Sequence, residues 1–220
     1  MGDGPFAIAL DKYNCRFQIA GPGAFSGIRE IYVRDVYLRD GWLQIRPQDV
    51  VMDLGANMGN FSALALAVDP SVRVIAVEPS QTMNERFRTS IGLNEGFLRR
   101  TLLIRGFVGS PSEKVARVIR NDQNYADVSW ITEDELIERA GVTRIDFLKC
   151  DIEGGEFGLL GSDSKLLAMT RALACEVHAF AGDVRQFMEN IGACGFVLGP
   201  VQQDPDGTVT FLAKRVAETG

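Results

Sequence analysis

Short apolar runs alternate with helical patterns along the chain from Val50 onward. Val50–Leu54 is almost wholly apolar, and it is followed by a glycine-containing turn and then by the helical segment Phe61–Val68. This order predicts a buried strand that leads into a helix. The pattern recurs, and such alternation is typical of an α/β fold in which helices cover both faces of a mostly parallel sheet.

The same criteria predict the remaining elements. Further strands are expected at Val72–Val77, Thr101–Val108, Ile145–Cys150 and Ala172–Val177, with a small extra strand at Val115–Ile119. Helices are expected at Gln81–Leu93, Phe157–Leu160, Lys165–Met169 and Val184–Ile191, and between Thr132 and Gly141, where Thr132 and Glu135 have capping-box spacing. A polar turn that ends in Asp206-Gly207 separates Phe196–Val201 from Thr208–Ala213, which predicts a final antiparallel hairpin.

The organisation of the chain follows from these elements. We interpret residues 50–220 as one domain with a Rossmann-like, doubly wound, mostly parallel sheet that ends in an antiparallel hairpin. Residues 1–49 precede the alternation, and we interpret them as an N-terminal extension and a candidate lid over the site. Because ligands of doubly wound sheets bind beyond the carboxyl ends of the strands, we expect the chemistry of this protein there.

Composition and charge exclude several classes of protein. The chain has 220 residues, of which 46% are hydrophobic and 24% charged, as expected for an ordinary globular domain. The net charge of −6 is the opposite of what non-specific nucleic-acid binding requires. Apolar stretches such as Ala63–Val68 are far shorter than the ~20 residues that cross a bilayer. We therefore expect a soluble, cytoplasmic protein with neither a nucleic-acid nor a membrane partner.

The cysteines show no metal or redox pattern. Cys15, Cys150, Cys175 and Cys194 include no C-x-x-C pair, and the chain has a single histidine. We expect all four to be small core residues in a reducing compartment rather than zinc ligands or disulfides.

The turn after the first predicted strand indicates a nucleotide-type site. It reads Asp53-Leu54-Gly55-Ala56-Asn57-Met58-Gly59-Asn60-Phe61, and its glycines allow the backbone to approach a ligand closely. A dinucleotide fingerprint needs glycine where Asn57 stands. Residues 47–72 contain no Lys or Arg, and Asp53 would repel a pyrophosphate. The pattern therefore favours S-adenosylmethionine, which carries a sulfonium and an ammonium, over NAD.

A second acidic residue supports this interpretation. Glu78 ends the second predicted strand, where a carboxylate can accept hydrogen bonds from both hydroxyls of an adenosine ribose, and Pro79 fixes the backbone that leaves the strand. The expected cofactor-binding residues are Asp53, Gly55, Ala56, Asn57, Gly59, Asn60, Phe61, Glu78, Pro79, Ser80 and Asp151.

The next two strand ends carry the candidate catalytic residues. If strand geometry persists, Lys149, Asp151 and Glu153 lie on one side of their segment, and burying that set without a partner would be costly. The following strand ends with Glu176 and with His178, the single histidine. The expected catalytic residues are Asp151, His178, Glu153 and Lys149.

These segments resemble the FkbM family of S-adenosylmethionine-dependent methyltransferases over roughly Val50 to His178. The resemblance rests on Val51-Met52-Asp53-Leu54-Gly55-Ala56-Asn57-Met58-Gly59, Val77-Glu78-Pro79, Leu148-Lys149-Cys150-Asp151-Ile152-Glu153-Gly154-Gly155-Glu156 and Glu176-Val177-His178. It implies the class I methyltransferase fold. Known members mostly methylate hydroxyls on sugars, polyketides and other metabolites, so the resemblance also implies O-methylation of a small hydroxylated acceptor.

The sequence leaves parts of the mechanism open. A base must take the proton of the acceptor hydroxyl, and His178 or Asp151 is expected to do so, with Glu153 or Glu176 as an orienting group and Lys149 paired with these carboxylates. The main hypothesis contains no metal, although carboxylates at these strand ends could hold a divalent cation such as Mg²⁺ against a diol acceptor. Two competing hypotheses about the protein's class are a non-catalytic S-adenosylmethionine-binding module and an NAD-dependent oxidoreductase.

Overall fold

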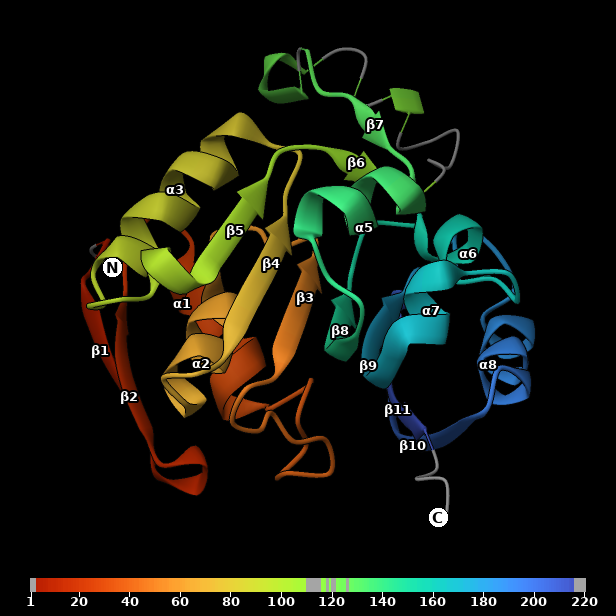
Figure 1. The fold of residues 1–220 in the computed structure, drawn as a ribbon, viewed down its shortest axis with the longest axis horizontal. Coiled ribbons are helices and arrows are strands. Elements are labelled where there is room, and N and C mark those ends of the chain that lie inside the picture. Colours follow the sequence, from red (N-terminus) through yellow and green to blue (C-terminus); the bar gives the residue numbers. More distant parts are fainter. Residues whose placement is uncertain (1–2, 110–115, 118, 120–121, 126, 216–220) are drawn as a thin grey trace.

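The centre of the molecule is a seven-stranded sheet with the order β10-β11-β9-β8-β3-β4-β5 (Figure 1). The computed structural model describes residues 3–109, 116, 117, 119, 122–125 and 127–215. The strands of the sheet are β3 (Val50–Leu54), β4 (Arg73–Val77), β5 (Thr101–Ile104), β8 (Ile145–Cys150), β9 (Thr170–Val177), β10 (Phe196–Gln203) and β11 (Val209–Arg215). The strands from β3 to β9 in this sheet are parallel, whereas β11 runs antiparallel to both β9 and β10. The predicted α/β fold and its final hairpin are thus confirmed.

Helices fill the connections between the parallel strands and pack on both faces of the sheet (Figure 1). They are α2 (Asn60–Val68), α3 (Gln81–Gly92), α5 (Glu133–Ala140), α6 (Glu156–Leu159), α7 (Lys165–Met169) and α8 (Val184–Ala193), with short 3₁₀ turns η3 (Leu98–Arg100) and η4 (Gln123–Tyr125). A further 3₁₀ turn, η1 (Asp11–Tyr13), lies in the N-terminal extension. The capping box predicted at Thr132 and Glu135 begins α5. No helix in the described part of the chain is long and apolar enough to cross a lipid bilayer.

Two hydrophobic cores lie on opposite faces of the sheet because successive strand residues point in opposite directions. Val51 of β3 belongs to one core, together with Phe61 of α2 and Phe87 of α3. Met52, the next residue, belongs to the other core, which includes Leu136 of α5 and Ile191 of α8. The apolar run of each central strand therefore serves both faces, as its lack of polar alternation predicted.

The N-terminal residues form an additional layer on the α2–α3 side. Strands β1 (Phe6–Leu10) and β2 (Cys15–Ile19) make an antiparallel pair, and they are followed by α1 (Ala24–Gly27) and the π-helix η2 (Ile28–Val33). The inward residues of β2 join the core that contains α2 and α3. The extension therefore shares its hydrophobic core with the main sheet.

Two predictions about strands are wrong. The run predicted as Thr101–Val108 leaves the main sheet after Ile104, and β6 (Phe107–Val108) pairs instead with β7 (Trp130–Ile131) in a separate two-stranded sheet. At Gly106, between the two parts, a Cβ would lie only 2.1 Å from the Ile131 side chain, so glycine allows this crossing. The small strand predicted at Val115–Ile119 is also wrong, since residues 116, 117 and 119 are helical, while 115 and 118 lie outside the described residues. Apolar residues at 115, 118 and 119 have helical spacing, which a strand interpretation of so short a run overlooks.

Three of the four cysteines are core residues, as predicted. All four are free thiols; Cys15, Cys150 and Cys175 are buried, whereas Cys194 is only partly covered. Cys150 and Cys175 are neighbours across β8 and β9.

The strand order creates a switch point beside β3. From β3 the chain builds outward to β4 and β5 on one side, and then returns to place β8 on the other. Leu54 pairs with Val77 at the end of β4 and with Cys150 at the end of β8. The residues that follow these three strands are therefore adjacent at one edge of the sheet, toward which the arrowheads of β3 and β4 point in Figure 1.

Candidate functional site

The glycine turn after β3 is held closely against the ends of its two neighbouring strands. Gly55 has a φ of +74°, and a Cβ at this position would lie 1.7 Å from the carbonyl oxygen of Asp151, so only glycine fits here. The backbone amides of Gly55 and Ala56 both donate to the carbonyl of Val77 at 3.0 Å. Gly59, at a φ of +87°, begins α2 against the ring of Phe87. These contacts fix the conformation of the glycine turn at the switch point.

Glu78 directly follows β4 and contacts the glycine turn. Its side chain is almost fully buried, and its two oxygens accept hydrogen bonds from the backbone amides of Asn57 and Ser80, each at 2.8 Å. Burial raises the pKa of Glu78, while the two amides act in the opposite direction. Because a carboxylate offers about four acceptor positions, Glu78 retains capacity for two further donors. The sequence prediction is therefore compatible with its position.

A cavity of about 700 Å³ opens in front of Glu78. Such a volume lies within the usual range of roughly 300–1,000 Å³ for small-molecule and cofactor sites. Its wall includes Glu78, Pro79, Ser80, Asp151 and Glu153, together with Phe107, Tyr125 and Trp130. The rings of Phe107 and Trp130 stack at 4.7 Å with an interplanar angle of 19°.

The aromatic part of this wall was missed by the sequence analysis. Phe107 lies in the run that we predicted as one strand of the main sheet, whereas the separate β6–β7 pair brings it to Trp130. The two residues are far apart in the sequence, and the chain offers no local pattern that joins them. Only the departure of the chain from the main sheet at Gly106 creates this wall.

A second cavity of about 120 Å³ adjoins the first, with which it shares Gly55, Asn57 and Asp151. The N-terminal residues Glu30 and Tyr37 form part of its wall. Asn60, at the start of α2, also lines it, and its Oδ1 is buried without a hydrogen-bond partner among the described residues. A buried acceptor without a donor is costly, so this atom marks a position for a hydrogen-bonding ligand.

Two of the expected cofactor-binding residues are almost completely buried. The side chain of Asp53 has 0% exposure; it accepts a hydrogen bond from Ser62 at 2.6 Å and forms an ion pair with Lys149 at 3.4 Å. A direct contact between Asp53 and a cationic ligand would require this carboxylate to leave its buried pair. The ring of Phe61 is buried between Tyr37 and Phe147, where it supports the small cavity from the core.

Lys149 occupies the centre of this arrangement. Its ammonium donates to the carbonyls of Leu54 at 3.2 Å and of Gly55 at 2.7 Å, and it lies 3.5 Å from Asp151. Burial alone would lower the pKa of Lys149, but the carboxylates of Asp151 and Asp53 outweigh this effect and raise it. Lys149 is therefore a buried cation that fixes the glycine turn and balances two carboxylates.

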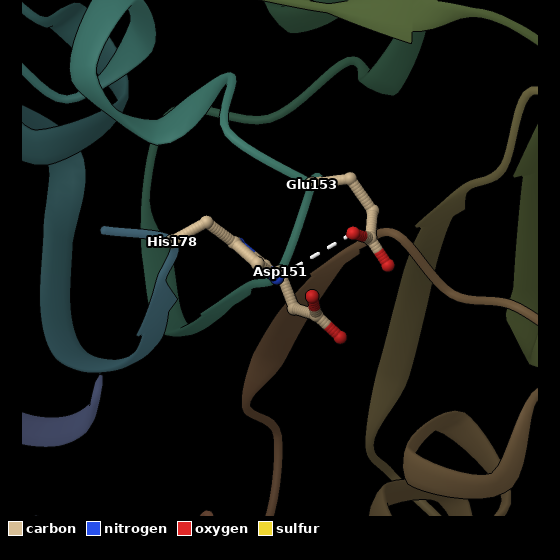
Figure 2. Close-up of side chains that lie close together, drawn as sticks. All are labelled: Asp151, Glu153 and His178. Carbon is tan, nitrogen blue, oxygen red and sulfur yellow. Dashed lines mark ion pairs between the residues drawn. The ribbon is translucent and has the colours of Figure 1, made fainter. Parts of the chain in front are cut away.

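The side chains of Asp151, Glu153 and His178 converge, as Figure 2 shows; Asp151 and Glu153 line the large cavity, whereas His178 lies behind them and lines neither cavity. Asp151 is 26% exposed and faces both cavities, whereas Glu153 is 75% exposed and lies 3.5 Å from Nε2 of His178. The His178 ring is itself buried, and its Nδ1 lies 3.2 Å from the fully buried carboxylate of Glu156. The structure thus brings together the expected Asp151, Glu153 and His178.

The protonation of His178 follows from its neighbours. Burial alone would lower the pKa of His178, but Glu156, through its hydrogen bond and charge, and then Asp151 and Glu153 raise it to about 9. This shift favours the protonated ring at neutral pH. A protonated imidazole offers no lone pair, so His178 must lose a proton before it can act as a base or bind a metal.

Glu176 lies apart from this group and faces the N-terminal extension. Its carboxylate accepts a hydrogen bond from the hydroxyl of Tyr37 at 3.3 Å. Burial and the nearby Asp151 and Glu30 raise the pKa of Glu176 to about 7. Within the described residues, the group of side chains spaced closely enough to surround a metal ion includes His178 and excludes Glu176.

Comparison with solved structures identifies the class of fold. The structure of fibrillarin from Aeropyrum pernix with natively bound S-adenosyl-L-methionine matches with a TM-score of 0.52 and 14% identity, over 82% of this chain and 74% of that one. A precorrin-6y C5,15-methyltransferase from Geobacter metallireducens matches with a TM-score of 0.52 and 14% identity, over 84% of this chain and 87% of that one. The fold is that of the class I methyltransferases.

Sequence comparison identifies the family. The family model described as the methyltransferase FkbM domain matches residues 53–198, so this chain belongs to the FkbM methyltransferase family. The chain is 24% identical over 217 residues to the 31-O-demethyl-FK506 methyltransferase FkbM of Streptomyces tacrolimicus, covering 80% of this chain and 83% of that protein. It is also 27% identical over 197 residues to the AMB antimetabolite synthetase AmbE of Pseudomonas aeruginosa, covering 68% of this chain but only 9% of the synthetase.

Proposed function

We propose that this protein is an S-adenosylmethionine-dependent methyltransferase that methylates a hydroxyl group on a small acceptor such as a sugar, a polyketide or another metabolite. The observation that carries the proposal is that Glu78 and Asp151 both line the 700 Å³ cavity at the switch point of the sheet. In this proposal Glu78 binds the ribose and Asp151 receives the proton.

The residues around the two cavities fit the cofactor. Glu78 has free acceptor capacity for the two ribose hydroxyls, and the stacked pair of Phe107 and Trp130 offers an aromatic wall to the adenine. The buried Oδ1 of Asn60 and the carboxylate of Glu30 offer acceptors to an ammonium group in the small cavity. In this arrangement Asp53 acts on the cofactor indirectly, by holding Lys149 beneath the turn.

The chain's own part in the reaction is to hold the acceptor and to take its proton. When bound, S-adenosylmethionine supplies an electrophilic methyl group, which becomes bonded to the acceptor oxygen as its bond to sulfur breaks. The displaced hydroxyl proton needs an acceptor on the protein. Since His178 is protonated at neutral pH, we assign this role to the carboxylate of Asp151, which lies between the two cavities.

The choice of acceptor class rests on the family. One relative is named as a methyltransferase of 31-O-demethyl-FK506, and another as an antimetabolite synthetase, so both names describe the chemistry of small molecules. The net charge of −6 supports the same choice over a nucleic-acid acceptor.

The first experiment measures thermal stabilisation by S-adenosylmethionine, S-adenosylhomocysteine and NADH. A ligand at 100 times its dissociation constant adds about 2.7 kcal/mol to the free energy of unfolding, which is easily detected. We expect stabilisation by the two sulfur ligands alone, with roughly tenfold weaker binding to Glu78→Gln because charge-assisted hydrogen bonds become neutral ones. The exposed Glu138 on α5 provides a matched control in Glu138→Gln. Stabilisation by NADH alone would refute the proposed cofactor.

The second experiment measures methyl transfer to a panel of hydroxylated metabolites. Asp151→Asn is expected to bind the cofactor normally and to lose turnover. Full turnover in Asp151→Asn would remove this residue from the proposed chemistry, and methylation of amines but not of hydroxyls across the panel would contradict O-methylation.

A further inference from the structure

Glu156 is a fully buried carboxylate to which the sequence analysis assigned no role. It is the first residue of α6, and its Oε1 accepts hydrogen bonds from the backbone amides of Ile152 at 2.9 Å and Gly154 at 3.2 Å. The same oxygen lies 3.2 Å from Nδ1 of His178, 22 residues further along the chain. Glu156 therefore ties the turn that carries Asp151 and Glu153 to the end of β9.

The contact also fixes the orientation of the imidazole. An ionised carboxylate accepts hydrogen bonds and cannot donate them, so Nδ1 of His178 must carry a hydrogen. The other ring nitrogen, Nε2, then points toward Glu153, in the group that includes Asp151 at the cavity edge (Figure 2). Both of these neighbours are carboxylates, so Nε2 faces hydrogen-bond acceptors and is suited to carry a hydrogen as well.

We propose that Glu156 is a positioning residue that holds His178 as a fixed, doubly protonated hydrogen-bond donor behind the cavity wall, where Nε2 orients the carboxylate of Glu153 toward the acceptor while Asp151 takes the acceptor's proton. This inference rests on the proposed O-methyltransferase function and adds to it a division of labour between His178 and Asp151. The inference depends on a chain of contacts that runs from Glu156 through the His178 ring to Glu153, which lines the large cavity.

The charges around His178 agree with this role from every side. Glu156 faces the ring from α6, and Asp151 and Glu153 face it from the turn after β8. The charges of Glu176 on β9 and of Asp206 in the β10–β11 turn act on the ring from further away. All five are acidic, and the ring of Phe180 covers the imidazole at 5.5 Å. Together they favour the charged imidazole, whose pKa is raised to about 9.

Glu156 in turn depends on the charge of His178. Its second oxygen, Oε2, is buried and has no hydrogen-bond partner among the described residues. A buried carboxylate in this state is costly unless a cation lies close by. The imidazolium 3.2 Å from its other oxygen supplies that cation.

The test uses the fact that His178 is the single histidine of the chain. Its ¹⁵N and ¹H ring resonances can be assigned without ambiguity and titrated in the whole protein, with no acceptor and no turnover. In the wild type we expect both nitrogens to be protonated at pH 7.5, with a midpoint near pH 9. In Glu156→Gln we expect the midpoint to fall by about one unit or more, because the closest charge is lost while an oxygen still meets the two backbone amides.

The control is Glu153→Gln, whose carboxylate is largely exposed and is therefore expected to shift the midpoint much less than Glu156→Gln. A wild-type midpoint near the ordinary value of about 6.5 would overturn the proposal even if Glu156→Gln fails to fold. A folded Glu156→Gln with an unchanged midpoint would overturn it as well. Neither result requires methyl transfer, so both are distinguishable from a failure of the proposed function.

The dependence of methyl transfer on pH gives the second readout. If His178 acts as a donor, kcat/KM of the wild type falls as pH rises through about 9. In Glu156→Gln, kcat/KM falls at a lower pH, and the KM for the acceptor rises more than the KM for the cofactor. In Glu156→Asp, kcat/KM is expected to fall at a pH between the values for the wild type and for Glu156→Gln. A rate that instead increases through pH 9 would identify His178 as the base and would overturn the division of labour between His178 and Asp151.

Discussion

The buried pair of Asp53 and Lys149 gives the most direct prediction about stability. Asp53 has no exposed surface, and the ammonium of Lys149 lies 3.4 Å from its Oδ1, an oxygen with no hydrogen-bond partner among the described residues. In Lys149→Met the carboxylate stays buried with only the hydroxyl of Ser62 as a donor. Removing one partner of a buried pair costs about 3–5 kcal/mol, since the remaining charge is left uncompensated. We expect a loss of that size in the free energy of unfolding.

A double-mutant cycle isolates the charge from the loss of packing. Asp53→Asn alone leaves Lys149 beside Asp151, so it is expected to cost less than Lys149→Met. Combining the two substitutions removes both charges and should recover roughly 1–3 kcal/mol relative to the sum of the single changes. Urea unfolding followed by circular dichroism measures all four free energies. If the two single-variant losses add within about 0.5 kcal/mol in the double variant, the proposed coupling between the two charges is refuted.

The cycle also separates the two roles considered for Asp53. If this residue acts through Lys149, Asp53→Asn binds S-adenosylmethionine nearly as tightly as the wild type. If it contacts the cofactor directly, as its place in the sequence predicted, Asp53→Asn loses cofactor affinity while its stability stays close to that of the wild type. The same thermal-shift titration distinguishes these outcomes.

Three further predictions concern the glycine turn, the charge of His178 and the need for a metal. Gly55→Ala is expected to cost at least about 2 kcal/mol of stability and to weaken cofactor binding, because a Cβ there meets a backbone oxygen at a positive φ. The control, Gly192→Ala on the open side of α8, should cost nothing. Equal losses of stability in thermal unfolding of the two variants would contradict the prediction. The raised pKa of His178 contributes up to ~3 kcal/mol of stability, which is fully present below pH 6.5 and is lost as pH rises through about 9. The free energy of unfolding should therefore fall over that pH interval in the wild type, and should fall much less in His178→Gln. Methyl transfer should be unaffected by a strong chelator, and activity that is abolished by the chelator and restored by Mg²⁺ would place a divalent cation back in the mechanism.

Local patterns in the sequence were sufficient for the main sheet. The apolar runs of β3 and β8 are bounded as predicted, because strands covered on both faces have continuous apolar sequences that end abruptly at polar residues. The capping box of α5 is equally local, since its two residues satisfy each other's backbone amides within one turn. The sequence also indicated which residues gather at the switch point, because all parallel strands end at the same edge.

The roles within that group depended on packing that no local pattern encodes. Asp53 lies near the end of β3 and Asp151 directly follows β8, yet Asp53 is buried in an ion pair with Lys149 and Asp151 faces the cavities. The aromatic wall exists because Gly106 lets the chain leave the sheet and pair β6 with β7. The sequence by itself determined the fold class and the edge of the sheet at which the candidate site lies, since both follow from the order of strands. Only the tertiary structure decided that His178 is held protonated by Glu156, because a pKa depends on charges and burial brought together from four separate parts of the chain.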